Sequence, residues 1–194
     1  MRIDKNDLLL YAVTDRQWLG EASLAEQLEE AIQAGVTVVQ LREKELDFDA
    51  FVSLGKELQA VAKRHRIPFI INDAVDVALA LDADGVHVGQ SDMQAGDVRS
   101  RIGEEKILGV SAHSVEEALA AERNGADYLG VGAIYGTATK PDANTLSIET
   151  LQQICQAVSI PVVGIGGIAE GNILNLNGSG INGVAVVSAI FAQP

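Results

Sequence analysis

The stretch Val38–Lys44 changes within seven residues from an apolar strand to a dense group of polar and charged side chains. Because side chains alternate along a strand, Gln40, Arg42 and Lys44 are predicted to converge on one side. The other side carries Leu41 and Glu43. An amide, a guanidinium and an ammonium together could hold an anion with several oxygens. The alternative is a solvated strand end whose charges form surface ion pairs.

Two carboxylates, Asp73 and Asp92, follow consecutive predicted strands. Neighbouring parallel strands would bring them to the same edge, where Mg²⁺ typically takes one or two carboxylates with substrate phosphate oxygens and water. The alternative is that each carboxylate caps the helix that follows it.

Two further segments suit phosphate. The loop from Gly136 to Pro141 contains two hydroxyls and a lysine among small residues that let backbone N–H groups approach a ligand. Gly166 and Gly167 after the seventh predicted strand, and Ser188 after the eighth, lie where many barrels bind phosphate. The sequence therefore predicts two anion-handling zones on one rim, which would fit two phosphorylated ligands, one of them a diphosphate.

Apolar runs alternate with helical patterns along the whole chain, which predicts parallel strands joined by right-handed crossovers. The predicted strands are Leu8–Thr14, Thr37–Leu41, Pro68–Asn72, Gly85–Val88, Ile107–Val110, Tyr128–Val131, Val162–Ile165 and Gly183–Val187. The predicted helices are Ser23–Ala34, Phe48–His65, Ala74–Leu81, Ala95–Arg101, Val115–Asn124, Ser147–Ile154 (running on towards Val158) and, with a weaker pattern, Asn172–Leu176.

A glycine lies at or just before the start of every second predicted strand, at Gly35, Gly85, Gly125 and Gly183. This fourfold recurrence favours a closed (β/α)₈ TIM barrel over an open doubly wound sheet. We expect an α/β protein in which residues 1–194 form a single TIM-barrel domain. Few residues follow Ser188, so the closing C-terminal helix is expected to be short or missing.

The composition excludes several classes of protein. With 47% hydrophobic and 21% charged residues the chain is not disordered. A net charge of −13 disfavours nucleic acid and anionic membranes as partners. No apolar run approaches the roughly 18 residues of a membrane span, and Met1–Asp7 is charged, so a cytoplasmic location is expected. Cys155 is the only cysteine, which excludes an internal disulfide.

Short motifs along nearly the whole chain resemble, in order, those of the thiamine-phosphate synthase (thiamine-phosphate pyrophosphorylase) family. Each motif alone is modest, but ten in sequence are specific. They are Tyr11–Asp15, Gln40–Lys44, Ile71–Asp73, Gly85–Gln90, Asp92–Met93, Gly109–Ser111, Gly130–Gly132, Thr137–Lys140, Gly164–Ile168 and Val187–Ala189.

The resemblance implies a transferase of thiamine biosynthesis that uses Mg²⁺. It would condense 4-amino-5-hydroxymethyl-2-methylpyrimidine diphosphate with 4-methyl-5-(2-phosphoethyl)thiazole, giving thiamine phosphate and pyrophosphate. Arg42, Lys140 and Ser111 would be catalytic. The pyrimidine diphosphate would be bound by Gln40, Leu41, Arg42, Glu43, Lys44, Asn72, Ser111 and Lys140, the thiazole phosphate by Thr137, Ala138, Thr139, Gly167, Val187 and Ser188, and the metal by Asp73 and Asp92.

Two other functions fit part of this pattern. A thiazole tautomerase would share the fold and the thiazole phosphate site, and a non-catalytic thiamine-phosphate-binding regulatory protein would need no leaving-group chemistry. The set Gln40, Arg42, Lys44 and Lys140, with both carboxylates, argues against each. The expected partners are small phosphorylated molecules, and homo-oligomer formation stays open. His87 is expected to point into the barrel as a packed polar residue.

Overall fold

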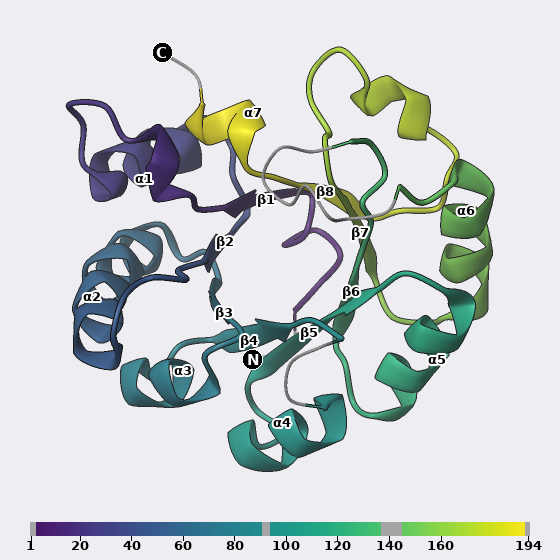
Figure 1. Ribbon diagram of the computed structural model, residues 1–194, viewed down its shortest axis with the longest axis horizontal. Helices are drawn as coiled ribbons and strands as arrows, with labels where there is room; N and C mark the ends of the chain where they lie inside the picture. Colours follow the sequence, from purple (N-terminus) through teal and green to yellow (C-terminus); the bar gives the residue numbers. More distant parts are fainter. Residues whose placement is uncertain (1–2, 91–93, 137–144, 193–194) are drawn as a thin grey trace.

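The computed structural model describes residues 3–90, 94–136 and 145–192, and these form a closed barrel of eight parallel strands in sequence order (Figure 1). The predicted (β/α)₈ fold is confirmed. The strands are β1 (Leu10–Val13), β2 (Val38–Leu41), β3 (Phe69–Asn72), β4 (Gly85–Val88), β5 (Ile107–Ala112), β6 (Tyr128–Val131), β7 (Val162–Ile165) and β8 (Gly183–Val186). Each lies within two residues at either end of its predicted range.

Helices surround the barrel (Figure 1). They are α1 (Leu24–Gln33), α2 (Phe48–His65), α3 (Val75–Leu81), α4 (Ala95–Ile102), α5 (Val115–Arg123), α6 (Ile148–Ala157) and α7 (Ser188–Phe191), with 3₁₀ helices η1 (Arg16–Trp18) and η2 (Ile173–Leu176). The short closing helix that the sequence predicts is α7. It lies beside α1, with Phe191 buried.

Side-chain caps define several helix starts. The Ser23 hydroxyl accepts from the Glu26 N–H and the Glu26 carboxylate accepts from the Ser23 N–H, which together form a capping box at α1. Asp47 caps α2 by accepting from the Ala50 N–H at 2.9 Å. Helix α2 ends at Arg66, whose φ of 61° turns the chain out of the helix.

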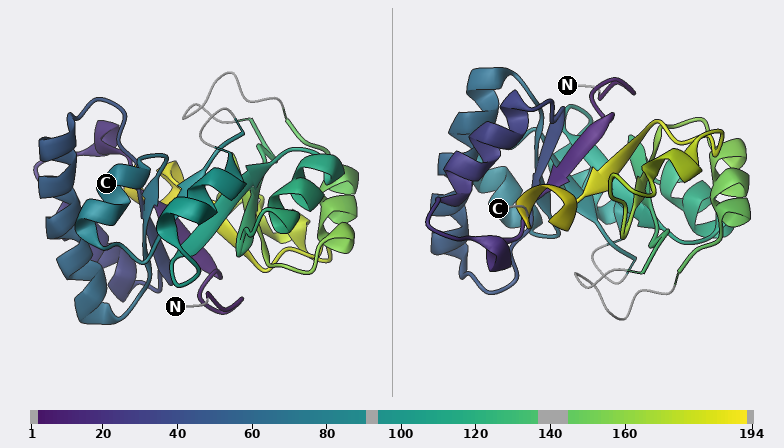
Figure 2. Two further views of the ribbon diagram at one scale, coloured as in Figure 1. Left: turned by 90° about the horizontal axis from the view of Figure 1, so that it is seen from below. Right: turned by 90° about the horizontal axis from the view of Figure 1, so that it is seen from above.

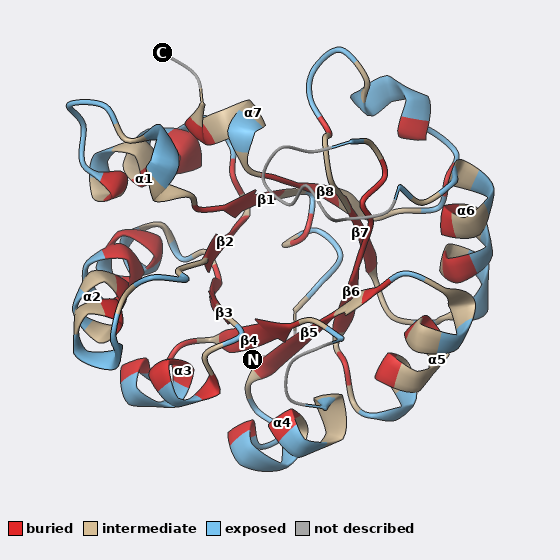
Figure 3. Ribbon diagram, viewed as in Figure 1, coloured by how far each residue is buried: buried red, intermediate tan, exposed pale blue. Residues whose placement is uncertain are grey.

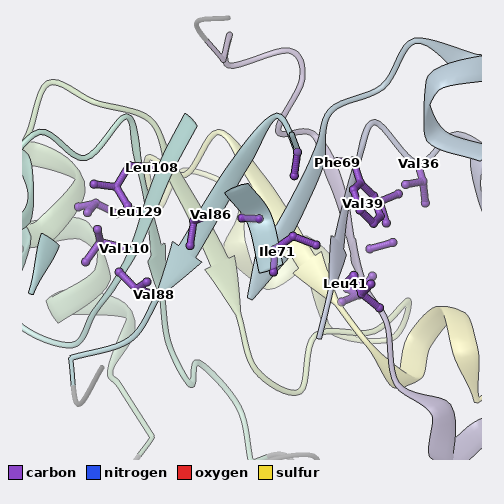
Figure 4. Close-up of a cluster of buried hydrophobic side chains, with 14 of the residues drawn as sticks. Val36, Val39, Leu41, Phe69, Ile71, Val86, Val88, Leu108, Val110 and Leu129 are labelled. Carbon is purple, nitrogen blue, oxygen red and sulfur yellow. The ribbon is translucent and has the colours of Figure 1, made fainter. Parts of the chain in front are cut away.

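Two separate apolar layers fill the structure. The larger lies between the outer face of the strands and the helices, so the inner faces of the helices are the buried ones (Figure 3). Val39, Leu41, Phe69 and Ile71 belong to it (Figure 4). The smaller layer fills the barrel interior and consists of Leu8, Tyr11, Val13, Val38, Ile70, Ile107, Tyr128, Val163 and Ala185.

The N-terminal segment lies at the end of the barrel where the strands begin (Figure 2). Ile3 packs there against the interior layer. This end is therefore covered, and the pocket opens at the opposite end, among the carboxyl ends of the strands. The described residues contain no helix long and apolar enough to cross a membrane.

Candidate active site

The main pocket receives side chains from all eight strands or from the residues that directly follow them. It is lined by Tyr11, Val13, Gln40, Arg42, Asn72, His87, Ser111, His113, Tyr128, Gly130, Gly132, Ala133, Val163, Ile165, Gly166, Gly167, Ile168, Ala185, Val186, Val187 and Ser188. The side contributed by β2 to β5 is rich in polar side chains, whereas that contributed by β6 to β8 is rich in glycine and aliphatic residues.

The end of β2 follows the predicted alternation. Gln40 is 5% exposed and, like Arg42, lines the pocket, while Leu41 is fully buried in the outer layer. Thr14 fixes this end, because its N–H donates to the Gln40 carbonyl at 2.9 Å and its hydroxyl accepts from the Arg42 N–H at 3.1 Å. Lys44 is exposed and is not among the lining residues.

Glu43 is engaged away from the pocket. Its carboxylate, 5% exposed, accepts two hydrogen bonds from the Arg16 guanidinium, at 2.7 and 2.8 Å. The guanidinium offsets the charge of this carboxylate, so it would repel an anion at Arg42 less than a free carboxylate would. The predicted contact of Glu43 with a diphosphate stays a prediction, and the pairing with Arg16 favours its backbone for that contact.

Asp73 follows β3 in the left-handed conformation, with φ of 59°. Its N–H donates to the His87 carbonyl at 2.9 Å, and its carboxylate accepts from the Asn72 amide at 2.6 Å. Left-handed backbone is uncommon for residues other than glycine and often marks functional positions. The alternative that Asp73 caps α3 is wrong, because the N-cap is Ala74 and no side chain caps this helix.

The chemistry of Asp73 fits Mg²⁺, which prefers carboxylate and phosphate oxygens. Within the described ranges, no cluster of three or more acidic, histidine or cysteine side chains could hold a metal ion. A metal ion bound here would therefore take ligands from a substrate as well. The second predicted ligand, Asp92, lies outside the described residues.

A chain of hydrogen bonds crosses the pocket floor from β2 to β5. The Gln40 Nε2 donates to the Tyr11 hydroxyl at 2.8 Å, and this hydroxyl lies 2.7 Å from that of Tyr128. The Tyr128 hydroxyl is 3.0 Å from Nδ1 of His87, whose Nε2 is 3.0 Å from the Ser111 hydroxyl. Burial raises the pKa of Tyr11 and of Tyr128 well above that of a free phenol, so both remain neutral. The inward orientation predicted for His87 is confirmed.

The glycine-rich side is organised by Asn172. Its amide nitrogen donates to the Gly167 carbonyl and its amide oxygen accepts from the Ala169 N–H, both at 2.9 Å. Gly166 and Gly167 have φ of 99° and 63°, so this turn needs glycine. Val187 and Ser188 complete this wall at the start of α7.

Four further predicted site residues lie outside the described residues: Thr137, Ala138, Thr139 and Lys140. Sequence reasoning did not propose Tyr11, Tyr128 or Asn172 as site residues. Alternation along β1 and β6 was the available signal for the tyrosines, because it places Tyr11 with Val13, and Tyr128 with Gly130, on the inward face.

A closed (β/α)₈ barrel with a polar pocket at the carboxyl ends of its strands belongs to the TIM-barrel class, whose active sites lie at this end. The particular family follows from comparison with known proteins. The family model described as thiamine monophosphate synthase matches residues 10–190.

The thiamine-phosphate synthase of Clostridium acetobutylicum is 54% identical over 186 residues, covering 96% of this chain and 88% of the relative. That of Methanobrevibacter smithii is 50% identical over 185 residues, covering 95% and 88%. The solved structure of thiamine phosphate pyrophosphorylase from Pyrococcus furiosus superposes with a TM-score of 0.89 at 39% identity, covering 97% of this chain and 90% of that one.

The chain belongs to the thiamine monophosphate synthase family. The predicted family and the predicted enzymatic role in thiamine phosphate synthesis are confirmed. The two alternatives, a thiazole tautomerase and a non-catalytic binding protein, are not favoured.

Proposed function

We propose that the pocket joins 4-amino-5-hydroxymethyl-2-methylpyrimidine diphosphate to 4-methyl-5-(2-phosphoethyl)thiazole, giving thiamine phosphate and pyrophosphate. The observation that carries this assignment is the division of the pocket wall. A polar half from β2 to β5 suits a diphosphate, and a glycine and aliphatic half from β6 to β8 suits a small apolar ring with one phosphate.

The pyrimidine diphosphate would be held at the polar half by side chains of Gln40, Arg42, Asn72, Ser111 and Lys140. The segment from Leu41 to Lys44 would add backbone contacts and the Lys44 ammonium. The bond between the pyrimidine methylene carbon and the diphosphate oxygen breaks, and its electron pair leaves with pyrophosphate. The electron-rich aminopyrimidine can carry the cation that remains, so no general base is needed. The residues act by stabilising charge on the leaving group and by alignment.

Asp73 and Asp92 are the residues that would hold Mg²⁺ against the diphosphate. When bound, Mg²⁺ would neutralise part of the charge that develops on the leaving pyrophosphate. The position of Asp73 next to Asn72, which lines the pocket, supports this role.

The thiazole phosphate would lie against Gly167, Val187 and Ser188, with Thr137 to Thr139 adding hydroxyl and backbone donors. The lone pair of the thiazole nitrogen then forms the new bond to the pyrimidine methylene carbon, and the nitrogen becomes positively charged. Because the substrates carry phosphate charges that do not cross a bilayer unaided, we place the reaction in the cytoplasm.

The test is formation of thiamine phosphate and pyrophosphate from the two substrates with Mg²⁺. Asp73→Ala and Lys140→Ala should each lower the rate by on the order of 10²–10³. Lys56→Ala removes an exposed lysine of α2 and should leave the rate unchanged. Tight binding of the thiazole phosphate without any product from the unmodified protein would contradict the proposal.

A further inference from the structure

We propose that Tyr11, Tyr128 and His87 are positioning residues whose hydrogen-bond chain fixes the Ser111 hydroxyl as a proton donor toward the ligand. The identity of that ligand, the diphosphate of the pyrimidine substrate, rests on the proposed function. The direction of the protons in the chain does not, because it follows from the donors and acceptors of the protein alone.

The direction is set at the Gln40 end. An amide nitrogen only donates, so the Tyr11 oxygen accepts from Gln40 at 2.8 Å. The single proton of Tyr11 then points to the Tyr128 oxygen, 2.7 Å away. Both hydroxyls are buried and neutral, and each therefore brings one proton. If Tyr128 donated to Tyr11 instead, the buried Tyr11 proton would lose the Tyr128 oxygen as its acceptor, and an unsatisfied buried donor is costly.

The Tyr128 proton in turn points to Nδ1 of His87, at 3.0 Å. A ring nitrogen that accepts has no proton, so an imidazole that accepts at Nδ1 carries its one ring proton on Nε2. Nε2 then donates to the Ser111 oxygen, at 3.0 Å. The proton of Ser111 is directed away from His87, into the pocket that this side chain lines.

The barrel makes room for this chain with two glycines. A Cβ at Gly109 would lie 2.2 Å from the Tyr128 ring and 2.5 Å from Nδ1 of His87, and a Cβ at Gly130 would lie 2.9 Å from the His87 ring. The rings of Tyr128 and His87 are 5.5 Å apart between centroids, tilted by 41°. The imidazole is therefore held between two strands, with one nitrogen toward Tyr128 and the other toward Ser111.

The consequence for the reaction is a donor whose proton is kept away from His87 and toward the pocket side. A serine hydroxyl free to rotate must be ordered when the ligand binds, whereas the Ser111 proton is already directed from His87 toward the pocket, where the diphosphate would lie. Donors organised in advance stabilise developing charge without a cost of reorganisation. Tyr128 and His87 would act on the rate only through Ser111.

The first experiment measures the tautomer of His87 by ¹⁵N NMR of the ligand-free protein near neutral pH. Substituting the two other histidines, His65→Gln and His113→Gln, simplifies the spectrum. We expect the proton on Nε2 and an unprotonated Nδ1. A proton on Nδ1, alone or together with one on Nε2, would overturn the proposed direction.

The second experiment is a double-mutant cycle on kcat/KM for thiamine phosphate formation. Tyr128→Phe alone should lower kcat/KM by about 10-fold to 100-fold, because the Ser111 proton is no longer directed. In a Ser111→Ala background the same substitution should change it by about twofold or less. A merely structural role of Tyr128 would give equal losses in both backgrounds, and that result would overturn the proposal.

Tyr11→Phe breaks the chain at a different link and should show the same coupling to Ser111, which gives a second test if Tyr128→Phe does not fold. The two proposals also fail in distinguishable ways. If the unmodified protein forms no thiamine phosphate, the proposed function fails, while the tautomer of His87 still decides the direction of the chain.

Discussion

Arg16 and Glu43 form a two-pronged salt bridge that joins the loop after β1 to the end of β2. The pair lies directly beside Arg42, the cation that the proposed function assigns to the diphosphate. Glu43 is thereby prevented from competing for Arg42. Its position in the sequence suggests a ligand contact, whereas its side chain serves to hold the strand end.

The Glu43 carboxylate is almost buried, and Arg16→Ala removes the guanidinium that pairs with it. We expect it to lower the free energy of unfolding by about 1–2 kcal/mol. It should also raise KM for the pyrimidine diphosphate, because Glu43 can then turn to Arg42. Urea unfolding and steady-state kinetics measure the two effects. Arg16→Ala/Glu43→Gln should recover most of both, and a double variant as impaired as the single one would contradict this explanation.

Gly167→Ala should distort the glycine turn. The residue has φ of 63°, and an added Cβ would lie 2.5 Å from the Gly136 carbonyl oxygen and 2.8 Å from Cβ of Tyr135. We expect a loss of about 1–3 kcal/mol in unfolding free energy and a higher KM for the thiazole phosphate. Gly171→Ala, where an added Cβ meets nothing within 4 Å, is the matched control. Equal changes in unfolding free energy and in KM for the two variants would argue against a strained turn at Gly167.

Arg99 should be important for stability and not for chemistry. Its guanidinium donates to the carbonyls of Gly103, Lys106 and Gly125 and to the Asp127 carboxylate, while its side chain is only 11% exposed. Arg99→Ala removes the donor of all these hydrogen bonds, so we expect the free energy of unfolding to fall by about 2–4 kcal/mol.

The measurement for Arg99→Ala is urea unfolding, with kcat at a temperature where both proteins are folded. Arg123→Ala, at the exposed end of α5, removes the same charge as a control and should change stability little. A stable Arg99→Ala protein would show that these contacts contribute little.

The contact between α1 and α2 should depend on pH. Hydrogen bonds from His65 and Arg64 lower the pKa of Glu29 from 4.5 to about 2. A carboxyl whose pKa is lower in the folded state stabilises the fold above its ordinary pKa, and this contribution disappears as pH falls toward the folded value. The unmodified protein should therefore exceed Glu29→Gln in stability at about pH 6.

This difference should decrease steadily between about pH 4.5 and about pH 2. Urea titrations of both proteins at several pH values measure it. A difference that is independent of pH over this interval would exclude ionised Glu29 as its source.

The sequence predicts the fold well because each element carries a local signal. Helix α2 has the predicted bounds, since Asp47 caps it and the cations of its last turn precede Arg66. The segment near Asn172 differs, because its side chain binds the backbone of its own loop, and the chain forms a 3₁₀ helix.

The site is predicted where alternation along one strand, or a place directly after a strand, is enough. Alternation along β2 predicts Gln40 and Arg42, and position after β7 and β8 predicts Gly167 and Ser188, all of which line the pocket. Tyr11 and Tyr128 are 117 residues apart in sequence, and each looks like an ordinary core aromatic. Closure of the eight-stranded barrel brings the two hydroxyl oxygens to 2.7 Å from each other.

The separation of the two apolar layers bears on how this enzyme can change over evolution. Substitutions such as Leu58→Met or Val98→Ile fall in the layer beneath the helices, from which the strands shield the pocket. Residues of that layer can be substituted during evolution, or redesigned for heat resistance, while catalysis is preserved. The interior layer has no such freedom, because Tyr11 and Tyr128 are at once packing residues and the floor of the pocket.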